Sequence, residues 1–395
     1  MSSAEQRDLD SHQGPRESLG YHPAIDGLRA LAVAAVLAYH GGIASFSAGY
    51  LGVDLFFALS GFLITSLLLK EVSNSGQITL LAFWGRRARR LLPALSLVVT
   101  FVALLSAFAY APGSFHHLRA DAAASLLYVA NWQFIGQGVD YFSAQALASP
   151  LTHTWSLAIE EQFYLLWPIV VLLIMRWRKS RLLLAGLAIA LALASALEMY
   201  LGSLANWSQT RLYYGTDSHA MGLALGAGLA ALLTKCSLER QSQKRLFSVL
   251  GFAGLTAWLS MALGVGGDPQ WMYRGGFFLV SLFATALIAS VWKLPNSALA
   301  RALAMKPLRA LGKISYGIYL WHYPIFLWLS SARMGFGGWG LFLLRLVVTL
   351  VISSFSYLAI ERHVRSDASF ARWPGVLAIG VSIVIAYGAV LLATA

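Results

Sequence analysis

Two neighbouring carboxylates interrupt an apolar stretch that is long enough to cross a membrane. Glu160 and Glu161 lie in the sequence TWSLAIEEQFYLLWP, inside the apolar run from residue 151 to residue 175. A charge at mid-bilayer costs several kcal/mol, so intramembrane acids normally face a protein-lined cavity and take part in function. The pair therefore predicts a polar site inside a membrane-embedded protein.

Arg29 and His40 supply complementary chemistry in the first apolar run. They are eleven residues apart, so their side chains share one helix face at a separation of about 16 Å along the axis. A second face comprises residues at spacings of three, four and four, namely His153, Ser156, Glu160 and Tyr164. Glu161 is turned about 100° away from this second face.

His40 and Glu160 are predicted to meet at one depth as an acid–base pair. A carboxylate beside an imidazole raises its basicity and fixes its tautomer, which suits a general base. Three alternatives stay open at this point. The first is that the pair is structural and takes no part in catalysis. The second is that Arg29 snorkels to the headgroups, and the third is that Glu161, and not Glu160, faces the imidazole.

Further polar residues lie where the apolar runs end or meet. The candidate substrate-binding residues are Asp54, His153, Asp217, Tyr319 and His322. Ser315, Tyr319 and His322 share one face of the run 314–331, although a lone histidine in such a run is more often structural. Asp217 lies at the mouth of another run, where it either binds an acceptor or caps a helix.

Four arginines gather in the sequence WGRRARRLLP, namely Arg86, Arg87, Arg89 and Arg90. Arginine forks bind phosphate in a bidentate manner, so the cluster predicts a clamp for a phosphate-bearing donor. The alternative is a stop-transfer anchor that contacts anionic lipid. The sequence carries none of the motifs of serine hydrolases, P-loop proteins or dinucleotide-binding proteins.

The composition places these residues in an integral membrane protein. Of 395 residues, 58% are hydrophobic and only 12% are charged, whereas soluble domains average about 25% charged residues. Apolar runs recur without the alternation of a barrel, which predicts an all-α bundle of ten to twelve transmembrane helices. The net charge of +12 lies mainly in short loops, so it indicates topology and not nucleic-acid binding. The single cysteine, Cys236, excludes an intramolecular disulfide, and no metal-ligand spacing occurs.

Twelve apolar segments can be drawn, but twelve spans would place the basic loop 176–181 opposite the arginine cluster. The positive-inside rule therefore favours eleven spans with a cytoplasmic N-terminus. The segment 120–135, which contains Asp121 and Asn131, is predicted to be re-entrant or interfacial. We expect residues 1–20 to be a flexible cytoplasmic tail. Residues 21–395 are expected to form one domain in the inner membrane of a bacterium.

In combination, these motifs resemble the acyltransferase-3 family of integral membrane O-acyltransferases, which modify surface glycans, lipid-linked sugars or macrolide-type natural products. The resemblance covers about residues 21–362. The motifs that carry it are DGLRALAVAAVLAYH, GYLGVDLFFALSGFLIT, RRARRLLP, LTHTWSLAIEEQFYLLWP, YGTDSHAMGLALG and ISYGIYLWHYPI. Two residues depart from the family pattern, because His219 stands where arginine is common and His363 where proline is common.

The resemblance implies an acyl-CoA donor, usually acetyl-CoA, and a hydroxyl acceptor. It also implies roles for the residues that match, with an essential pair, two buried acids and three inner-face arginines: Arg29 and His40, Glu160 and Glu161, and Arg86, Arg87 and Arg90. The partners expected on this basis are acyl-CoA, a carbohydrate or macrolide acceptor and membrane lipid, without nucleic acid or a metal.

The predicted mechanism joins these groups into one path. CoA phosphates bind the arginine cluster, and the pantetheine arm, with a reach of roughly 15–20 Å, passes Arg29 toward His40. His40 takes the proton of the acceptor hydroxyl, and Glu160 orients His40. Whether an acyl-histidine forms is left open. The rival hypothesis is a proton-coupled transporter of an anionic or acylated solute, with His40 and Glu160 as its proton relay.

Overall fold

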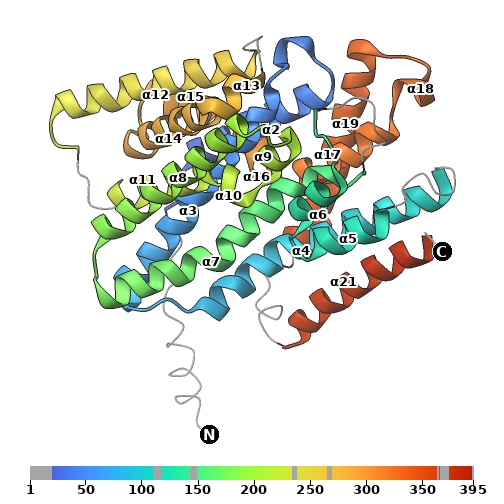
Figure 1. The fold of residues 1–395 in the computed structure, drawn as a ribbon, viewed down its shortest axis with the longest axis horizontal. Helices are drawn as coiled ribbons and strands as arrows, with labels where there is room; N and C mark the ends of the chain where they lie inside the picture. Colours follow the sequence, from blue (N-terminus) through green and yellow to red (C-terminus); the bar gives the residue numbers. More distant parts are fainter. Residues whose placement is uncertain are drawn as a thin grey trace, which may run out of the picture.

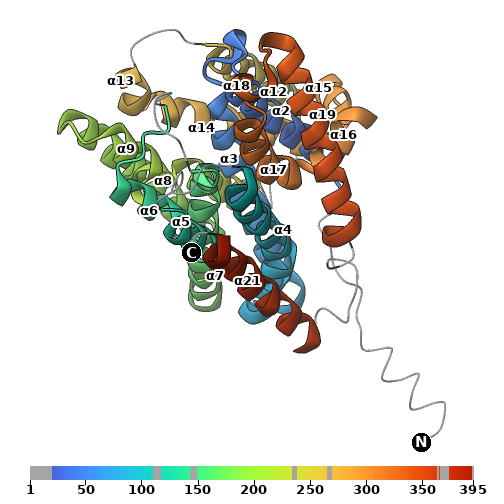
Figure 2. The same ribbon diagram turned by 90° about the vertical axis from the view of Figure 1, so that its right-hand side faces the viewer.

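The structure is a computed structural model that describes residues 20–109, 117–142, 149–233, 238–264, 269–362, 364 and 373–393. The N-terminal tail up to residue 19, Cys236 and His363 lie outside these ranges. Within them, the chain forms helices and short helical turns, without a strand. This result confirms the predicted all-α bundle (Figures 1 and 2).

The helices range from single turns to thirty residues. Those of seventeen or more residues are α2 (Pro23–His40), α3 (Gly52–Ser75), α4 (Leu80–Ala109), α7 (Trp155–Trp177), α8 (Arg181–Leu204), α12 (Gln241–Ala262), α14 (Phe277–Lys293), α19 (Gly338–Ser356) and α21 (Trp373–Ala393). The shorter ones are α5 (Leu118–Leu126), α6 (Ala130–Gln137), α9 (Gln209–Tyr214), α10 (Thr216–His219), α11 (Met221–Leu233), α13 (Pro269–Trp271), α15 (Ala298–Leu303), α16 (Lys306–Lys313), α17 (Ser315–Trp328) and α18 (Ser331–Met334).

Several helices have the length and apolarity of membrane spans. Seven such stretches occur in the described chain, namely Gly49–Ser75, Leu80–Phe108, Thr152–Trp177, Arg181–Leu204, Gln241–Ala262, Met272–Lys293 and Gly338–Ala359. α11 and the end of α21 are apolar but shorter. The chain is therefore a polytopic membrane protein, and the count of eleven spans stays a prediction.

The segment 120–135 does not form one continuous helix. α5 ends at Leu126, Tyr128 adopts a left-handed backbone conformation with φ of 55°, and α6 begins at Ala130. Helices of 9 and 8 residues are too short to cross a hydrocarbon core of about 30 Å. The break is consistent with a re-entrant or interfacial segment, and whether this segment crosses the membrane stays a prediction.

α3 runs through the centre of the bundle and contacts α2, α7, α11 and α14. Two glycines let it approach α11 closely. A Cβ on Gly61 would lie 1.9 Å from the carbonyl oxygen of Leu223, and one on Gly226 would lie 2.0 Å from that of Ala58. A side chain at either position would push the two helices apart. This close packing holds α3, which carries Ser60, in the interior.

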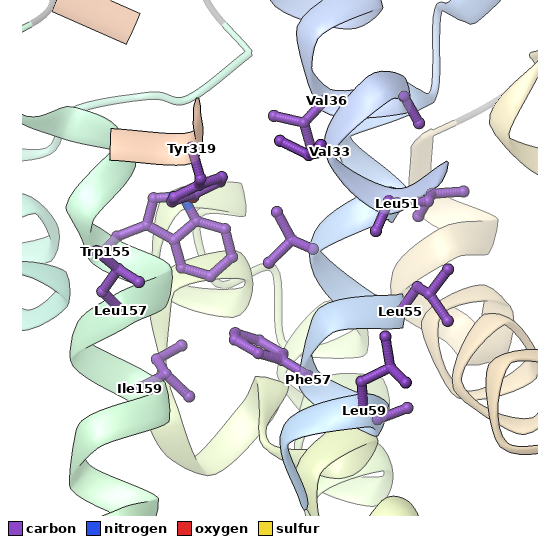
Figure 3. Close-up of a cluster of buried hydrophobic side chains, with 14 of the residues drawn as sticks. Val33, Val36, Leu51, Leu55, Phe57, Leu59, Trp155, Leu157, Ile159 and Tyr319 are labelled. Carbon is purple, nitrogen blue, oxygen red and sulfur yellow. The ribbon is translucent and has the colours of Figure 1, made fainter. Parts of the chain in front are cut away.

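Side chains of α2, α3, α7 and α17 meet in one buried cluster (Figure 3). Phe57 of α3 lies edge-to-face with Trp155 of α7, with their ring centroids 6.2 Å apart. Tyr319 of α17 lies beside Trp155 in the same cluster (Figure 3). Other helices lie outside this centre. α12 packs on α14, and α21 lies along α4 (Figures 1 and 2). The cluster thus brings together three separate parts of the chain, namely the consecutive helices α2 and α3, helix α7, and helix α17.

Candidate active site

A cavity of about 510 Å³ lies between α2, α3, α4, α7 and α17. This volume is typical of small-molecule sites. The cationic side chains that line the cavity are Arg29, Arg87, Arg90 and Lys313, and the acidic ones are Asp26, Glu160 and Glu161. We call the end formed by Tyr21, Arg87, Arg90 and Lys313 the arginine end. Ser156 and Tyr319 also line the cavity, and we call their side the tyrosine end, because Ser156 lies about two turns of α7 from Tyr164, over whose ring Arg87 lies.

Arg29 points into this cavity. Its Nε donates a hydrogen bond of 3.0 Å to Oγ of Ser315, and its guanidinium carbon lies 5.9 Å from the centre of the Phe56 ring. The snorkelling alternative is therefore wrong, because α17 holds the side chain inside the bundle. In the described part of the chain, neither terminal nitrogen of Arg29 has a hydrogen-bond partner. Both nitrogens can therefore donate to a ligand.

Glu160 and Glu161 line the cavity in different ways. Oε1 of Glu160 accepts hydrogen bonds from Oγ of Ser60 and from the hydroxyl of Tyr164. Glu161 was predicted to turn away, but its side chain lines the same cavity. Among the described residues it has no hydrogen-bond partner. Glu160 is thus held by the protein, whereas Glu161 is available to a ligand.

Only half of the arginine cluster reaches the cavity. Arg87 lies over the ring of Tyr164 at 5.2 Å, and Arg90 lines the cavity beside it. Arg86 instead pairs with Glu71 at 3.3 Å and is half exposed, and Arg89 is not part of the lining. The four residues lie on two different faces of α4, which explains this division. Arg87 and Arg90 face the cavity, whereas Arg86 and Arg89 face away from it. The four-arginine clamp is corrected to two.

A chain of hydrogen bonds runs through two histidines. Nδ1 of His322 lies 2.6 Å from the carbonyl oxygen of Tyr319, and its Nε2 lies 2.9 Å from Nδ1 of His40. Nε2 of His40 lies 2.9 Å from the hydroxyl of Tyr141. A carbonyl only accepts, so His322 carries its proton on Nδ1. When both rings are neutral, His40 donates through Nδ1 and accepts from Tyr141. We call these groups the histidine chain.

The predicted contact between His40 and Glu160 is wrong. Both ring nitrogens of His40 are bonded within the histidine chain, and Glu160 is bonded to Ser60 and Tyr164. His40 does not line the cavity either. Helical periodicity fixes which side chains share a face, but it does not say which neighbour that face meets. The group that bonds Nδ1 of His40 is instead His322 of α17, and neither glutamate is hydrogen-bonded to His40 among the described residues.

Tyr319 connects the cavity to the histidine chain. Its hydroxyl lies 2.7 Å from Oγ of Ser156 and donates to the carbonyl oxygen of His153 at 2.9 Å. Its own carbonyl holds His322. The His153 ring is fully buried, and neither of its nitrogens has a hydrogen-bond partner in the described part of the chain. The face predicted for residues 315, 319 and 322 therefore lies directly between α2 and α7.

Asp54 has a buried partner within the protein. Nε2 of His219 lies 3.0 Å from Oδ1 of Asp54, and Nδ1 of His219 lies 2.7 Å from the carbonyl oxygen of Tyr213. Both neighbours of the imidazole are acceptors, so one proton is shared between His219 and the carboxyl group. Asp54 does not line the cavity. This geometry corrects the expected substrate contact to a structural pair.

Asp217 lies on the outside of the bundle. Arg211 donates to both carboxylate oxygens, at 2.9 and 2.6 Å, and Trp132 and Trp207 flank the guanidinium at 5.5 and 5.0 Å. Burial favours the neutral acid, but the hydrogen bonds and charge of Arg211 outweigh it and lower the pKa of Asp217. The carboxylate is thus occupied by an arginine, away from both the cavity and the histidine chain.

Two site residues were not singled out from the sequence. Tyr141 lies in a loop after α6, about a hundred positions from His40, where no periodicity marks it. Ser60 is a small polar residue in an otherwise apolar run, and this signal was available. In the described ranges, histidine, cysteine and acidic side chains form no group of three that suits a metal ion.

Comparison with known proteins assigns the chain to a family. Residues 22–359 match the acyltransferase-3 family, described as an acyltransferase domain. O-acetyltransferase OatA of Staphylococcus aureus is 37% identical over 380 residues, which cover 95% of this chain and 62% of that protein. Peptidoglycan O-acetyltransferase OatA of Listeria monocytogenes is 40% identical over 365 residues, which cover 91% of this chain and 58% of that protein.

The chain therefore spans about three fifths of the length of these curated relatives. No solved structure matches it. The family match includes α2, α3, α4, α7, α17 and the loop that carries Tyr141, and thus both the cavity and the histidine chain. With most of its length matched, this chain belongs to the acyltransferase-3 family of integral membrane O-acyltransferases.

Proposed function

We propose that this chain transfers an acetyl group from acetyl-CoA to a hydroxyl of a carbohydrate acceptor, and that the acceptor is peptidoglycan or its lipid-linked precursor. The names of the two relatives support the acetyl group, and the Listeria name supports the acceptor. The observation that carries the proposal is the position of His40. Its Nε2 accepts a hydrogen bond from a hydroxyl at 2.9 Å, which is the ground-state geometry of a general base.

The donor enters at the arginine end, which we place at the cytoplasmic side because CoA is a cytoplasmic metabolite and basic residues favour that side. Arg87, Arg90 and Lys313 can neutralise its phosphates. The pantetheine arm then passes the free guanidinium nitrogens of Arg29. The thioester lies beside Ser156 and Tyr319, which line the cavity on the side away from Arg87.

The acceptor hydroxyl takes the place of the Tyr141 hydroxyl on Nε2 of His40. As its oxygen attacks the thioester carbonyl, the new C–O bond forms and the proton passes to Nε2. The C–S bond breaks, and the CoA thiolate leaves toward the cavity and is protonated to the thiol. His322 keeps the lone pair of His40 on Nε2 by accepting from Nδ1, as the orienting group of a catalytic triad does.

Purified protein in lipid nanodiscs, supplied with acetyl-CoA and soluble peptidoglycan fragments, tests this proposal. We expect free thiol to appear together with an acetyl ester on the fragment, measured by a thiol reagent and by mass spectrometry. The rival transporter predicts proton-coupled flux of solute without thiol release. Folded protein that releases no thiol with any glycan fragment would refute the proposal.

A further inference from the structure

The side chain of Tyr319 is the boundary between the two halves of the site. On one side it lines the cavity, together with Ser156. On the other side, its ring centroid lies 5.7 Å from that of His153 and 5.4 Å from that of His322. None of the three imidazoles nearby, at residues 40, 153 and 322, lines the cavity. A thioester in the cavity is therefore separated from His40 by the Tyr319 side chain and, behind it, by His322, whose Nε2 bonds Nδ1 of His40.

The hydroxyl of Tyr319 fastens its side chain to α7. It bonds to Oγ of Ser156 at 2.7 Å and donates to the carbonyl oxygen of His153 at 2.9 Å. Ser156 lies at the start of α7, the helix that carries Glu160, and His153 lies in the turn before it. Tyr319 thereby joins α17 to α7 across the end of the cavity, and Phe56 of α3 packs against its ring at 6.3 Å.

The two ends of the Tyr319 residue have separate tasks. Its backbone carbonyl, fixed in α17, holds Nδ1 of His322 and so sets the proton positions of the histidine chain. Its side chain closes the cavity. Rotation of the side chain leaves the carbonyl in place, so the cavity can open toward His40 while His40 keeps its tautomer.

We infer that Tyr319 is a specificity-determining residue, whose latched side chain keeps the thioester away from His40 until an acceptor is present, so that the acetyl group passes to the acceptor and not to water. This inference rests on the proposed function. Water is the competing nucleophile. If the cavity opens without an acceptor, a water oxygen forms the C–O bond, the C–S bond breaks, and His40 passes the water proton to the departing thiolate. The products are then acetate and CoA.

Tyr319→Phe is the informative change, because it keeps the ring and removes both hydrogen bonds of the latch. We expect thiol release without acceptor to rise at least about tenfold, the change produced by losing one to two net hydrogen bonds. With acceptor, the ratio of thiol to ester is expected to rise above the value of one that tight coupling gives. The double variant with His40→Ala is expected to lose the uncoupled release.

Tyr316→Phe is the matched control. Tyr316 also lines the cavity from α17, but its hydroxyl donates to the carbonyl oxygen of Leu91 in α4. This variant is expected to keep the thiol-to-ester ratio of the wild type, and a melting curve checks that each variant is folded. A purely structural role of Tyr319 would lower the melting temperature without changing that ratio.

Three results decide the question. Uncoupled release by Tyr319→Phe that depends on His40 supports the latch. An unchanged ratio in folded Tyr319→Phe overturns the latch alone, because the wild type still makes ester. A wild-type protein that releases no thiol with acceptor overturns the proposed function itself, and the latch with it.

Discussion

Replacement of His322 tests the most specific element of the account, the control of the His40 tautomer. His322→Met replaces the acceptor for Nδ1–H of His40 with a thioether sulfur, which accepts only weakly, and keeps a side chain of similar length. His322→Gln is the matched variant, because its carbonyl oxygen can accept the same hydrogen bond. In the methionine variant, the Nδ1–H of His40 loses its 2.9 Å partner.

The size of the effect follows from that lost bond. An unsatisfied buried donor costs about 1–3 kcal/mol. The base-competent tautomer of His40 carries this cost, whereas the other tautomer avoids it by donating from Nε2 to Tyr141. A penalty of this size corresponds to a loss of roughly 5- to 150-fold in kcat. His322 does not line the cavity, so KM for acetyl-CoA is expected to stay unchanged.

Thiol release at saturating acceptor, measured over a range of acetyl-CoA concentrations, separates kcat from KM. We expect His322→Met to fall in kcat alone and His322→Gln to recover most of the loss. Equal kcat values for the two variants, with both folded by melting curves, would refute the tautomer argument. An increase of KM without a change in kcat would instead place His322 in donor binding.

Three further outcomes are expected. Arg87→Ala is expected to raise KM for acetyl-CoA by roughly tenfold or more, since a charge-assisted hydrogen bond contributes about 1.5–3 kcal/mol. Arg86 faces away from the cavity, so Arg86→Ala is expected to leave KM unchanged, and steady-state kinetics of both variants check this. Gly226→Ala is expected to destabilise the protein by about 1–3 kcal/mol, because its Cβ would lie 2.0 Å from a carbonyl oxygen of α3. Gly136 has open space around it, so Gly136→Ala is expected to keep the wild-type melting temperature. Asp54→Ala leaves Nε2 of His219 without a hydrogen bond and is expected to destabilise the protein by about 1–3 kcal/mol, measured by thermal unfolding. Wild-type stability would show that the pair is dispensable.

Helical periodicity was sufficient to predict the two faces that form the site. Arg29 and His40 do share a face of α2, and Ser315 and His322 do share a face of α17. Their mutual contact could not be predicted, because spacing within one helix contains no information about its neighbours. For the same reason the sequence paired His40 with Glu160, when α17 stands between α2 and α7.

The arginine cluster and the loop residues show other limits of sequence reasoning. Arg86 and Arg87 are adjacent and chemically identical, and only the packing of α4 decides that Arg87 faces the cavity. Tyr141 lies outside the long helices, so neither hydropathy nor spacing indicated that it bonds His40. Asp54 was expected to bind substrate, but it is bonded to His219, which is 165 positions away in the sequence and so could not be predicted from spacing.

The role of His40 as general base is decided by the rate at which His40→Ala forms ester, with acetyl-CoA and glycan fragment both saturating. We expect kcat to fall by about 10²–10⁴, the range of a lost general base, and calorimetry to show unchanged acetyl-CoA binding because His40 does not line the cavity. If a folded His40→Ala variant forms ester at close to the wild-type rate, His40 is not the general base.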